Sequence, residues 1–372
     1  MNIIEFEETL VEMRMAKYRH PDIDIISQGF RPVSGKVADF GVAELDGVWH
    51  FFYIERRLAE GTPFYPGNEI YFGHASTRNL ADWEVHDPVM LIRPGTWEGA
   101  HVWAPVVMRM LGRDVMLGRD LKSRPNTAGG PSTAGGPNAV CGCTYVMAYT
   151  GVNEHISQDI GLAFSDDLFE WRRWEGNPIS PCKGRQWANW REDRISSCRD
   201  PHLFEHEGRF WMTYTANTAA GATCIAMCSS VDLEQWDDHG PILVGSAQGY
   251  EPRLEGGHPQ GSLESANLQH RSDRWHLLVN ASVRGADVRN WIFTSDRMDS
   301  FDFAAGREFW RDAGGIEVLG DCGSESLLAA FCNGFIRFGV VDWSADEPVG
   351  RFVQSREELD HWSARVKPPR SK

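Results

Sequence analysis

Two markers recur along the sequence at a regular interval of about 65 residues, and this repeat limits what the chain can fold into. One marker is a Ser or Thr followed six residues later by an aromatic residue, within a polar turn. The other is a polar turn followed by an aromatic-rich strand. Copies at Ser165, Ser230 and Ser295 are equally spaced. The first marker occupies 77–83, 165–171, 230–236 and 295–301, and the second occupies 46–53, 142–149, 207–214, 272–279 and 333–340.

One interval is longer than the others because of an insertion. The leading aromatics Trp49 and Tyr145 are separated by about one and a half times the usual interval. The excess contains segment 120–140, rich in Gly, Pro, Ser and Thr, in which TAGGP occurs twice. Such a segment cannot pack a core, so we expect a flexible loop. Without it the chain consists of five near-equal units.

Each unit holds several short runs of β-branched and aromatic residues broken by Gly, Pro, Asp and Asn, which is typical of strands. Five four-stranded units closed in a ring make an all-β, five-bladed β-propeller. Helical periodicity is confined to 5–17 and 355–364. We expect segment 20–35 to supply the strand that closes the last blade. The predicted organisation is an N-terminal helix and closing strand at 1–34, a catalytic propeller at 35–354 and a C-terminal tail at 355–372.

Composition excludes several classes of protein. With 52 acidic against 37 basic residues, the net charge of −15 argues against binding to nucleic acid. No apolar run reaches the ~20 residues of a membrane span, and the acidic start is unlike a signal peptide, so we expect a cytoplasmic protein. The eight cysteines form no paired CxxC motifs, so we expect reduced thiols, no metal and no cofactor. Fifteen tryptophans can fill blade cores or stack on sugar rings.

Acidic residues fall ten or eleven positions before the leading aromatic in four of the units. In a propeller this position lies on the innermost strand, near the central channel. Acidic residues also begin strands simply because strand starts are exposed, and a chain with 52 acids will show coincidences. The contexts here are apolar, however, and an unpaired charge is costly there. The residues are Asp39, Asp200, Glu264 and Glu325, and unit two has GAHVWAPVV instead, with His101 and Trp103.

Converging carboxyl groups suit the hydrolysis of glycosides. One protonated carboxyl gives a proton to the leaving oxygen, while another attacks the anomeric carbon or activates water. A third nearby carboxylate raises the pKa of the acid by repulsion. We expect Asp39, Asp200 and Glu264 to be catalytic. Glu325 is either a fourth polar contact to the substrate or a salt-bridge partner that closes the ring.

These residues resemble the five-bladed propeller glycoside hydrolases of families 32, 68, 43 and 62. Arg199, Asp200 and Pro201 are similar to the Arg-Asp-Pro motif, which holds the stabiliser of the transition state on the third blade. Glu264 in LESANL resembles the Glu-Cys-Pro-Asp segment that holds the general acid on the fourth blade. Asp39 takes the place of the nucleophile or base, but in Ala-Asp-Phe rather than Asn-Asp-Pro. Segment 64–91 is similar to invertases, and HVWAPVV is closer to family 43.

The resemblance implies a glycosidase acting on furanose-containing oligosaccharides, with a fructofuranosidase-like activity favoured. The alternatives are a family 43 arabinofuranosidase or xylosidase, a sugar-binding propeller without catalysis, and a transglycosylase. The expected partner is the oligosaccharide substrate, and the amphipathic N-terminal helix is a candidate dimer element. Arg199 either keeps Asp200 ionised or binds a sugar hydroxyl. Several further side chains either bind substrate or pack within the protein: Trp103, His101, Trp187 and Trp190.

Overall fold

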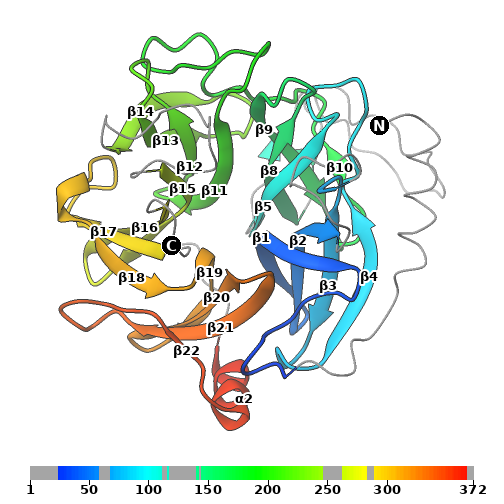
Figure 1. Cartoon of the computed structure of the whole chain (residues 1–372), viewed down its shortest axis with the longest axis vertical. Coiled ribbons are helices and arrows are strands. Elements are labelled where there is room, and N and C mark those ends of the chain that lie inside the picture. The colour runs from blue at the N-terminus through cyan, green and yellow to red at the C-terminus, as the bar shows by residue number, and fades with distance from the viewer. Residues whose placement is uncertain are drawn as a thin grey trace, which may run out of the picture.

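The computed structural model describes residues 24–57, 68–110, 115–116, 140–141, 144–245, 262–282 and 289–366. Five four-stranded antiparallel sheets surround a central axis, so the predicted five-bladed propeller is confirmed (Figure 1). The strands β1, β5, β11, β15 and β19 lie innermost in the five blades. Blade one contains β1 (Gly35–Leu45), β2 (Val48–Arg57), β3 (Phe72–Thr77) and β4 (Trp83–Val89).

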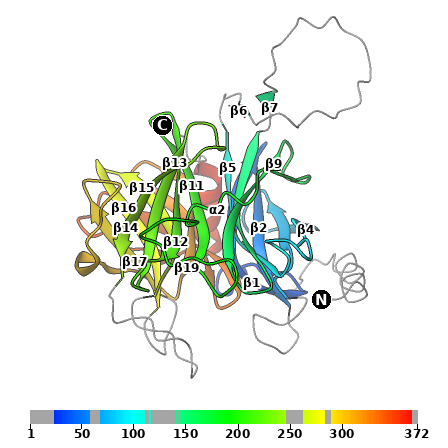
Figure 2. The ribbon, with the colours of Figure 1, turned by 90° about the horizontal axis from the view of Figure 1, so that it is seen from above.

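Each later blade follows the same order from the inside outward, except at the insertion in blade two. There the hairpin of β6 (Val115–Met116) and β7 (Val140–Cys141) interrupts the blade and lies beyond one face of the ring (Figure 2). Blade two contains β5 (His101–Arg109), β8 (Tyr145–Val152), β9 (Gln158–Ser165) and β10 (Arg172–Arg173). Blade three contains β11 (Cys198–His206), β12 (Arg209–Asn217), β13 (Thr223–Ser230) and β14 (Asp237–Val244). Blade four contains β15 (Ser262–Arg271), β16 (Arg274–Ser282), β17 (Arg289–Ser295) and β18 (Arg307–Arg311), with the 3-10 turn η1 (Phe303–Ala305) before β18.

Blade five corrects one prediction. It contains β19 (Gly314–Cys322), β20 (Glu325–Cys332), β21 (Phe335–Asp342) and β22 (Arg351–Phe352). The repeat predicts that 333–340 form the second strand of this unit, but these residues form the turn into the third strand, β21, and most of that strand. The prediction was wrong because the turns at Gly323 and at Gly334 both precede runs of apolar residues. The inner strand therefore begins about ten residues earlier than the repeat indicated.

The predicted closing strand at 20–35 is reduced to a single bridge. Phe30 and Ile336 exchange two backbone hydrogen bonds of 2.8 Å at the outer edge of β21. The regular fourth strand of blade five is instead β22, which pairs with Gly339 and Val340. Phe30, which precedes blade one, and β22, which ends blade five, thus both pair with β21. The pairing of Phe30 joins the first blade to the last.

Apolar side chains pack between neighbouring blades rather than within one core. In the described chain they form five clusters, one at each junction between blades. Trp49 is 6% exposed and packs at the junction of blades one and five, as expected of a repeat-equivalent aromatic. Burial of this kind is the main stabilising contribution to folding. Apolar packing at every junction therefore holds each blade to its two neighbours.

The predicted C-terminal helix is confirmed as α2 (Arg356–Arg365), which begins after the N-cap Ser355. Its Leu359 and Trp362 are buried in the junction of blades one and five. The predicted N-terminal helix at 5–17 and most of the insertion at 120–140 lie outside the described residues. Of the helices in the described part of the chain, none has the length and hydropathy needed to cross a membrane.

Candidate active site

All five inner strands carry a β-bulge at the same level of the ring. In each one the pairing with the second strand skips two residues before it resumes. A bulge bends a strand and redirects its side chains, and it is common beside active sites. The skipped pairs are Ala38–Asp39, Ala104–Pro105, Asp200–Pro201, Ser265–Ala266 and Gly315–Ile316, and the first residue has a left-handed backbone in every blade except blade one.

Asp200 lies on the bulge of blade three and is the most buried of the predicted acids, at 6% exposed. Its Oδ2 accepts hydrogen bonds from the Ser265 backbone N–H at 3.2 Å and from Thr215 Oγ1 at 3.3 Å, and Arg199 Nε lies 3.2 Å away. Burial raises the pKa of Asp200 to about 6, although the Arg199 charge opposes this and the Glu264 charge adds to it. Asp200 is thus held in one orientation by Thr215 and Arg199 of its own blade and by Ser265 of the next blade.

Glu264 precedes the bulge of blade four and has the most accessible carboxyl of the predicted catalytic acids. Its side chain is 39% exposed, and Arg199 Nη2 lies 3.2 Å from its Oε2. Arg199 also donates to Gln158 Oε1 at 3.2 Å and to Ser197 Oγ at 2.8 Å. One guanidinium therefore orients two carboxylates from adjacent blades, while Glu264 remains accessible to a ligand.

Asp39 occupies the second bulge position of blade one. Ser265 Oγ donates to its Oδ1 at 3.3 Å. Burial, followed by the charges of Asp200 and Glu264, raises the pKa of Asp39 to about 8, and the positive charge of Arg56 acts in the opposite direction. Arg56 is itself held by an ion pair with the buried Glu69. Asp39, Asp200 and Glu264 thus converge on one site from blades one, three and four.

A fourth carboxyl on blade five, Glu317, was not found from the sequence. It follows the bulge of β19 and lines a small cavity together with Asp39 and Asp200. Burial and the neighbouring charge of Asp39 raise the pKa of Glu317 to about 8. The Glu317 carboxyl therefore favours its protonated form while Asp39 is ionised, so it can carry a proton beside Asp39.

Glu325, predicted for this position, does not lie on the inner strand. It begins β20 and pairs with Cys322 at the hairpin turn, seven residues beyond the bulge at Gly315. At about 3.3 Å per residue this places it roughly 20 Å along the strand from the site. The error follows from the misplaced repeat in blade five. The signal that could have found Glu317 is the last interval between leading aromatics, from Trp275 to Phe335, which is shorter than the two before it.

The same cavity is lined by His202, whose Nε2 atom has no hydrogen-bond partner among the described residues. His202 follows the bulge of blade three and is 8% exposed, and its Nε2 is buried without a hydrogen bond. Burial lowers the pKa of His202 to about 4, so the ring is neutral. The cavity has a volume of about 30 Å³, which is enough for a water molecule with several polar neighbours.

His101 and Trp103 stand on the inner strand of blade two. Trp103 immediately precedes the bulge, so it is the structural equivalent of Arg199 and Glu264 on the next two blades. The His101 ring lies parallel to the Trp103 ring with centroids 5.4 Å apart, and His101 Nδ1 is 3.0 Å from the Asn68 carbonyl. The predicted stacking platform therefore lies at the level of the carboxylates.

Trp187 and Trp190 pack against the junction of blades two and three instead of converging on the acids. Trp187 Nε1 donates to Asp238 Oδ2 at 2.9 Å, on the outermost strand of blade three. Trp190 Nε1 donates at 2.8 Å to the backbone carbonyl of Gln158, the residue whose side chain contacts Arg199. Trp190 is thus linked to the carboxylate cluster indirectly, through Gln158 and Arg199, whereas Trp187 lies at the outer edge of blade three.

The described residues include no group of three or more His, Cys, Asp or Glu side chains arranged to hold a metal ion. The arrangement that they do form is a set of acids from four blades, two of which share the guanidinium of Arg199. Such a set can hold one carboxyl protonated and another ionised at the same pH, because repulsion separates the pKa values of neighbouring groups. This is the requirement for general acid catalysis combined with nucleophilic or base catalysis.

Comparison with known proteins agrees with this chemistry. A family model described as the glycosyl hydrolases family 32 N-terminal domain matches residues 31–310. No curated protein sequence matches the chain.

Solved structures share the fold at low identity. A fructan 1-exohydrolase IIa from Cichorium intybus is 15% identical with a TM-score of 0.61, over 89% of this chain and 60% of that one. A sucrose-6-phosphate hydrolase from Lactobacillus gasseri is 14% identical with a TM-score of 0.62, over 93% and 67%. An exo-1,5-alpha-L-arabinanase from a bovine ruminal metagenomic library is 14% identical with a TM-score of 0.54, over 87% and 99%. This chain therefore spans less than two thirds of the length of the fructan exohydrolase.

Proposed function

Because this chain belongs to glycosyl hydrolase family 32, we propose that it is a glycosidase that cleaves furanose-containing oligosaccharides with a fructofuranosidase-like activity. The observation that carries the proposal is the convergence of Asp39, Asp200 and Glu264 from three blades, with Arg199 paired to Asp200 and Glu264 and Ser265 bonded to Asp39 and Asp200. Gathering three acids at one site, with Asp200 buried, is costly for the fold. A catalytic role accounts for that cost.

Glu264 is proposed as the acid and base because it is the most accessible of the three. Its protonated form gives a proton to the glycosidic oxygen, so the bond from that oxygen to the anomeric carbon breaks and the leaving group departs neutral. Asp39, when ionised, either forms a bond to the anomeric carbon or removes a proton from an attacking water. Asp200, oriented by Arg199, Thr215 and Ser265, stabilises the positive charge that develops on the sugar ring.

Glu317 is proposed as a positioning residue that acts through Asp39. Its protonated carboxyl beside Asp39 keeps a second negative charge away from the nucleophile. This role would explain why blade five contributes a buried acid to the same cavity. Trp103, at the equivalent position on blade two, is proposed to stack on a sugar ring.

The alternative activity is that of an arabinofuranosidase or xylosidase of the family 43 type. It is favoured by the Trp103-Ala104-Pro105 stretch on the bulge of blade two, and a structural neighbour is an arabinanase. A panel of aryl furanosides and pyranosides separates the two activities by their kcat/KM values. Products longer than the substrate would instead indicate a transglycosylase, and binding without turnover a sugar-binding propeller.

The proposal is tested by the variant Glu264→Gln with Glu325→Gln as its control. We expect Glu264→Gln to lower kcat on natural glycosides about 10²-fold to 10⁴-fold, because the general acid is lost. Aryl glycosides with good leaving groups should retain more activity. Glu325→Gln should behave as the native chain. Unchanged turnover of natural glycosides by Glu264→Gln would exclude this assignment.

We also propose a cytoplasmic location and a homodimer formed through segment 5–17. The location is supported by buried free thiols at Cys182, Cys198, Cys224 and Cys228, which persist in a reducing compartment. Cell fractionation tests the location. Light scattering on the full chain and on a variant with three apolar residues of segment 5–17 changed to Ser tests the dimer.

A further inference from the structure

A cleft of about 430 Å³ lies between blades three and four, at the end of the strands opposite the carboxylates. His206, which lines it, ends the same strand β11 that carries Asp200. Six residues separate the two, which corresponds to about 20 Å at 3.3 Å per residue. The volume falls within the range of about 300–1,000 Å³ that is common for small-molecule sites. The cleft is therefore separate from the active site and large enough for a ligand.

The turn that follows the third strand is built in the same way in blades one, two and three. Its third residue, an Asn or Asp, accepts hydrogen bonds from two backbone N–H groups farther along the turn. Its fourth residue is a leucine with a left-handed backbone whose side chain is 0% exposed. The three turns are 77–83, with Leu80, 165–171, with Leu168, and 230–236, with Leu233.

Blade four departs from this design at both positions. The third residue is Arg297, which cannot accept hydrogen bonds and instead forms a two-pronged ion pair with Asp299, at 2.9 and 2.8 Å. The fourth residue is Met298, which lacks the left-handed backbone of the leucines and is only half-buried. Met298 lines the cleft. The side chain that fills the turn in three blades is thus replaced in blade four by a residue at the wall of a cavity.

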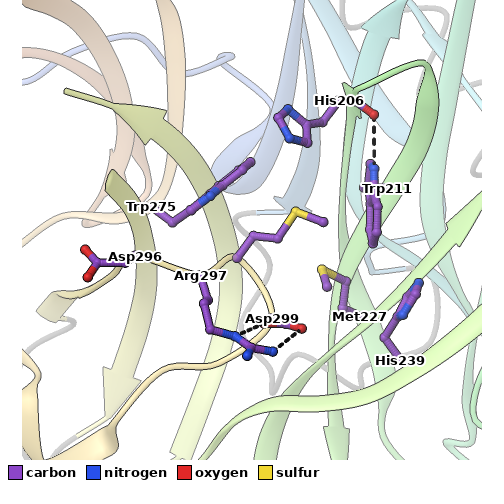
Figure 3. Close-up of a pocket in the computed structure, with 9 residues that line it drawn as sticks. His206, Trp211, Met227, His239, Trp275, Asp296, Arg297 and Asp299 are labelled. Atoms are coloured by element: carbon purple, nitrogen blue, oxygen red, sulfur yellow. Dashed lines mark hydrogen bonds and ion pairs between the residues drawn. The ribbon is translucent and has the colours of Figure 1, made fainter. Parts of the chain in front are cut away.

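The walls of the cleft combine aromatic faces with charged groups. Trp211 and Trp275 stand on opposite sides of it, while Arg297 and Asp299 lie together at another side (Figure 3). His239 lies stacked on Trp211, with ring centroids 5.0 Å apart. A sugar ring presents C–H groups to an aromatic face and hydroxyl groups to carboxylate and guanidinium groups.

The charge of the walls selects a neutral ligand over an anionic one. The only Lys or Arg among the lining residues, Arg297, is already paired with Asp299, and the further carboxylate of Asp296 also lies in the lining. An anionic ligand would therefore face excess negative charge. An entirely apolar ligand would have to desolvate the ion pair, which is also unfavourable.

We propose that this cleft is a second saccharide-binding site, which takes a neutral sugar unit of an oligosaccharide or polysaccharide. The choice of a sugar rests on the proposed function, whereas the cleft itself rests on the departure of blade four from the repeat. Because the cleft and the active site lie on one ring, a long substrate held at the cleft raises the local concentration of chain ends at the carboxylates. Short substrates gain nothing from it.

Methionine-methyl NMR tests the proposal, because Met227 and Met298 both line the cleft. The chain is studied as Glu264→Gln so that the probe, 1-kestose, is not consumed. We expect the methyl signals of Met227 and Met298 to shift and to saturate as 1-kestose is added. The double variant Arg297→Asp, Met298→Leu gives the turn the Asp-Leu pair of blade two. That variant removes the guanidinium and draws the fourth side chain into the buried position that the leucines occupy in the other turns. The cleft then loses a hydroxyl-binding group and part of its apolar wall, so the shift of Met227 should disappear.

Val231→Asp, in the equivalent turn of blade three, is the matched control, since it adds an exposed charge without changing the third or fourth residue. It should leave the Met227 shift intact. In the otherwise native chain, the double variant should keep kcat/KM on a disaccharide and lose about threefold or more on a long fructan. The proposed site would be excluded if the methyl signals of both methionines did not move as 1-kestose is added. It would also be excluded if the Met227 shift persisted in the double variant. Loss of all hydrolysis with saturable shifts would overturn the proposed function and leave this site standing.

Discussion

Arg199 and Glu264 are one repeat apart in sequence, and their side chains meet with Nη2 3.2 Å from Oε2. Both precede the bulge of their inner strand, on adjacent blades. The residues that follow them, Asp200 and Ser265, are also in contact, because the Ser265 backbone N–H donates to Asp200 Oδ2 at 3.2 Å. The repeat thus places an acid, its cation and the neighbouring acid side by side.

Replacing Arg199 with Gln removes the cation that both acids share. We expect kcat to fall by about 10²-fold to 10³-fold, because Glu264 and Asp200 lose their orientation and a charge-assisted contact. The pKa of Asp200 should rise, so the acid limb of the pH profile should move to higher pH. Arg199→Lys keeps the charge without the planar fork and should restore only part of the activity. Native kinetics in Arg199→Gln would show that the contact is structural only.

Removing the Glu317 carboxyl should shift the pH profile rather than abolish activity. Glu317→Gln keeps a hydrogen-bonding group of similar shape but can carry no negative charge beside Asp39. Because Glu317 is already neutral while Asp39 ionises, the acid limb of kcat/KM should stay in place. The alkaline limb should move to higher pH, since a second negative charge no longer forms beside Asp39 as the pH passes about 8. A profile from pH 4 to 9 measures this, with Glu325→Gln as the control. A loss of kcat that is the same at every pH, with an unmoved alkaline limb, would contradict the proposed link to Asp39.

The sequence could predict the ring and the acids of blades one, three and four because both follow from spacing alone. The regular period locates the hairpins, and the hairpins locate Asp39, Asp200 and Glu264 on their inner strands. The prediction from spacing failed in blade five, because the turns at Gly323 and at Gly334 both precede apolar runs. The spacing therefore indicated Glu325 instead of Glu317. Trp187 could not be placed either, because its partner Asp238 lies far along the chain on an outer strand. Contacts between side chains that are far apart along the chain leave no periodic pattern in the sequence.

Stability should fall as pH rises, because the buried acids are easier to bury protonated. The pKa values of Asp39 and Glu317 are about 8 in the folded chain, against roughly 4 when unfolded. Between these values the native state binds more protons than the unfolded state, so the free energy of unfolding falls with pH. Urea denaturation at pH 5.5 and pH 8 measures the difference. The double variant Asp39→Asn, Glu317→Gln should reduce it, and an undiminished difference would assign the dependence to other groups.

Trp103 and Trp187 provide a test of which tryptophan meets the substrate. Trp103→Ala should raise KM about fivefold, since a lost stacking contact costs about 1 kcal/mol. Trp187→Ala should lower the unfolding temperature and leave KM unchanged, because Trp187 packs against the blade junction and bonds to Asp238. Steady-state kinetics on one furanoside compares the two. A larger KM change in Trp187→Ala would reverse the assignment.

Gly315 should be required for the position of Asp39 as well as for the bulge. A Cβ at residue 315 would lie 2.6 Å from Asp39 Oδ1 and 2.9 Å from the Phe331 ring, on a backbone with φ of +51°. Gly323 also has a positive φ, +69°, but a Cβ there would meet nothing within 4 Å. Both Gly→Ala variants therefore carry a backbone cost of about 1–2 kcal/mol, but only Gly315→Ala displaces the carboxylate. We expect both to lower the unfolding free energy, Gly315→Ala by more because its Cβ also meets the Phe331 ring. Gly315→Ala alone should lose kcat, by about 10²-fold, as for a reacting group displaced by about 1 Å. Equal kcat values for the two variants would mean that Asp39 does not act from the position it occupies beside Gly315.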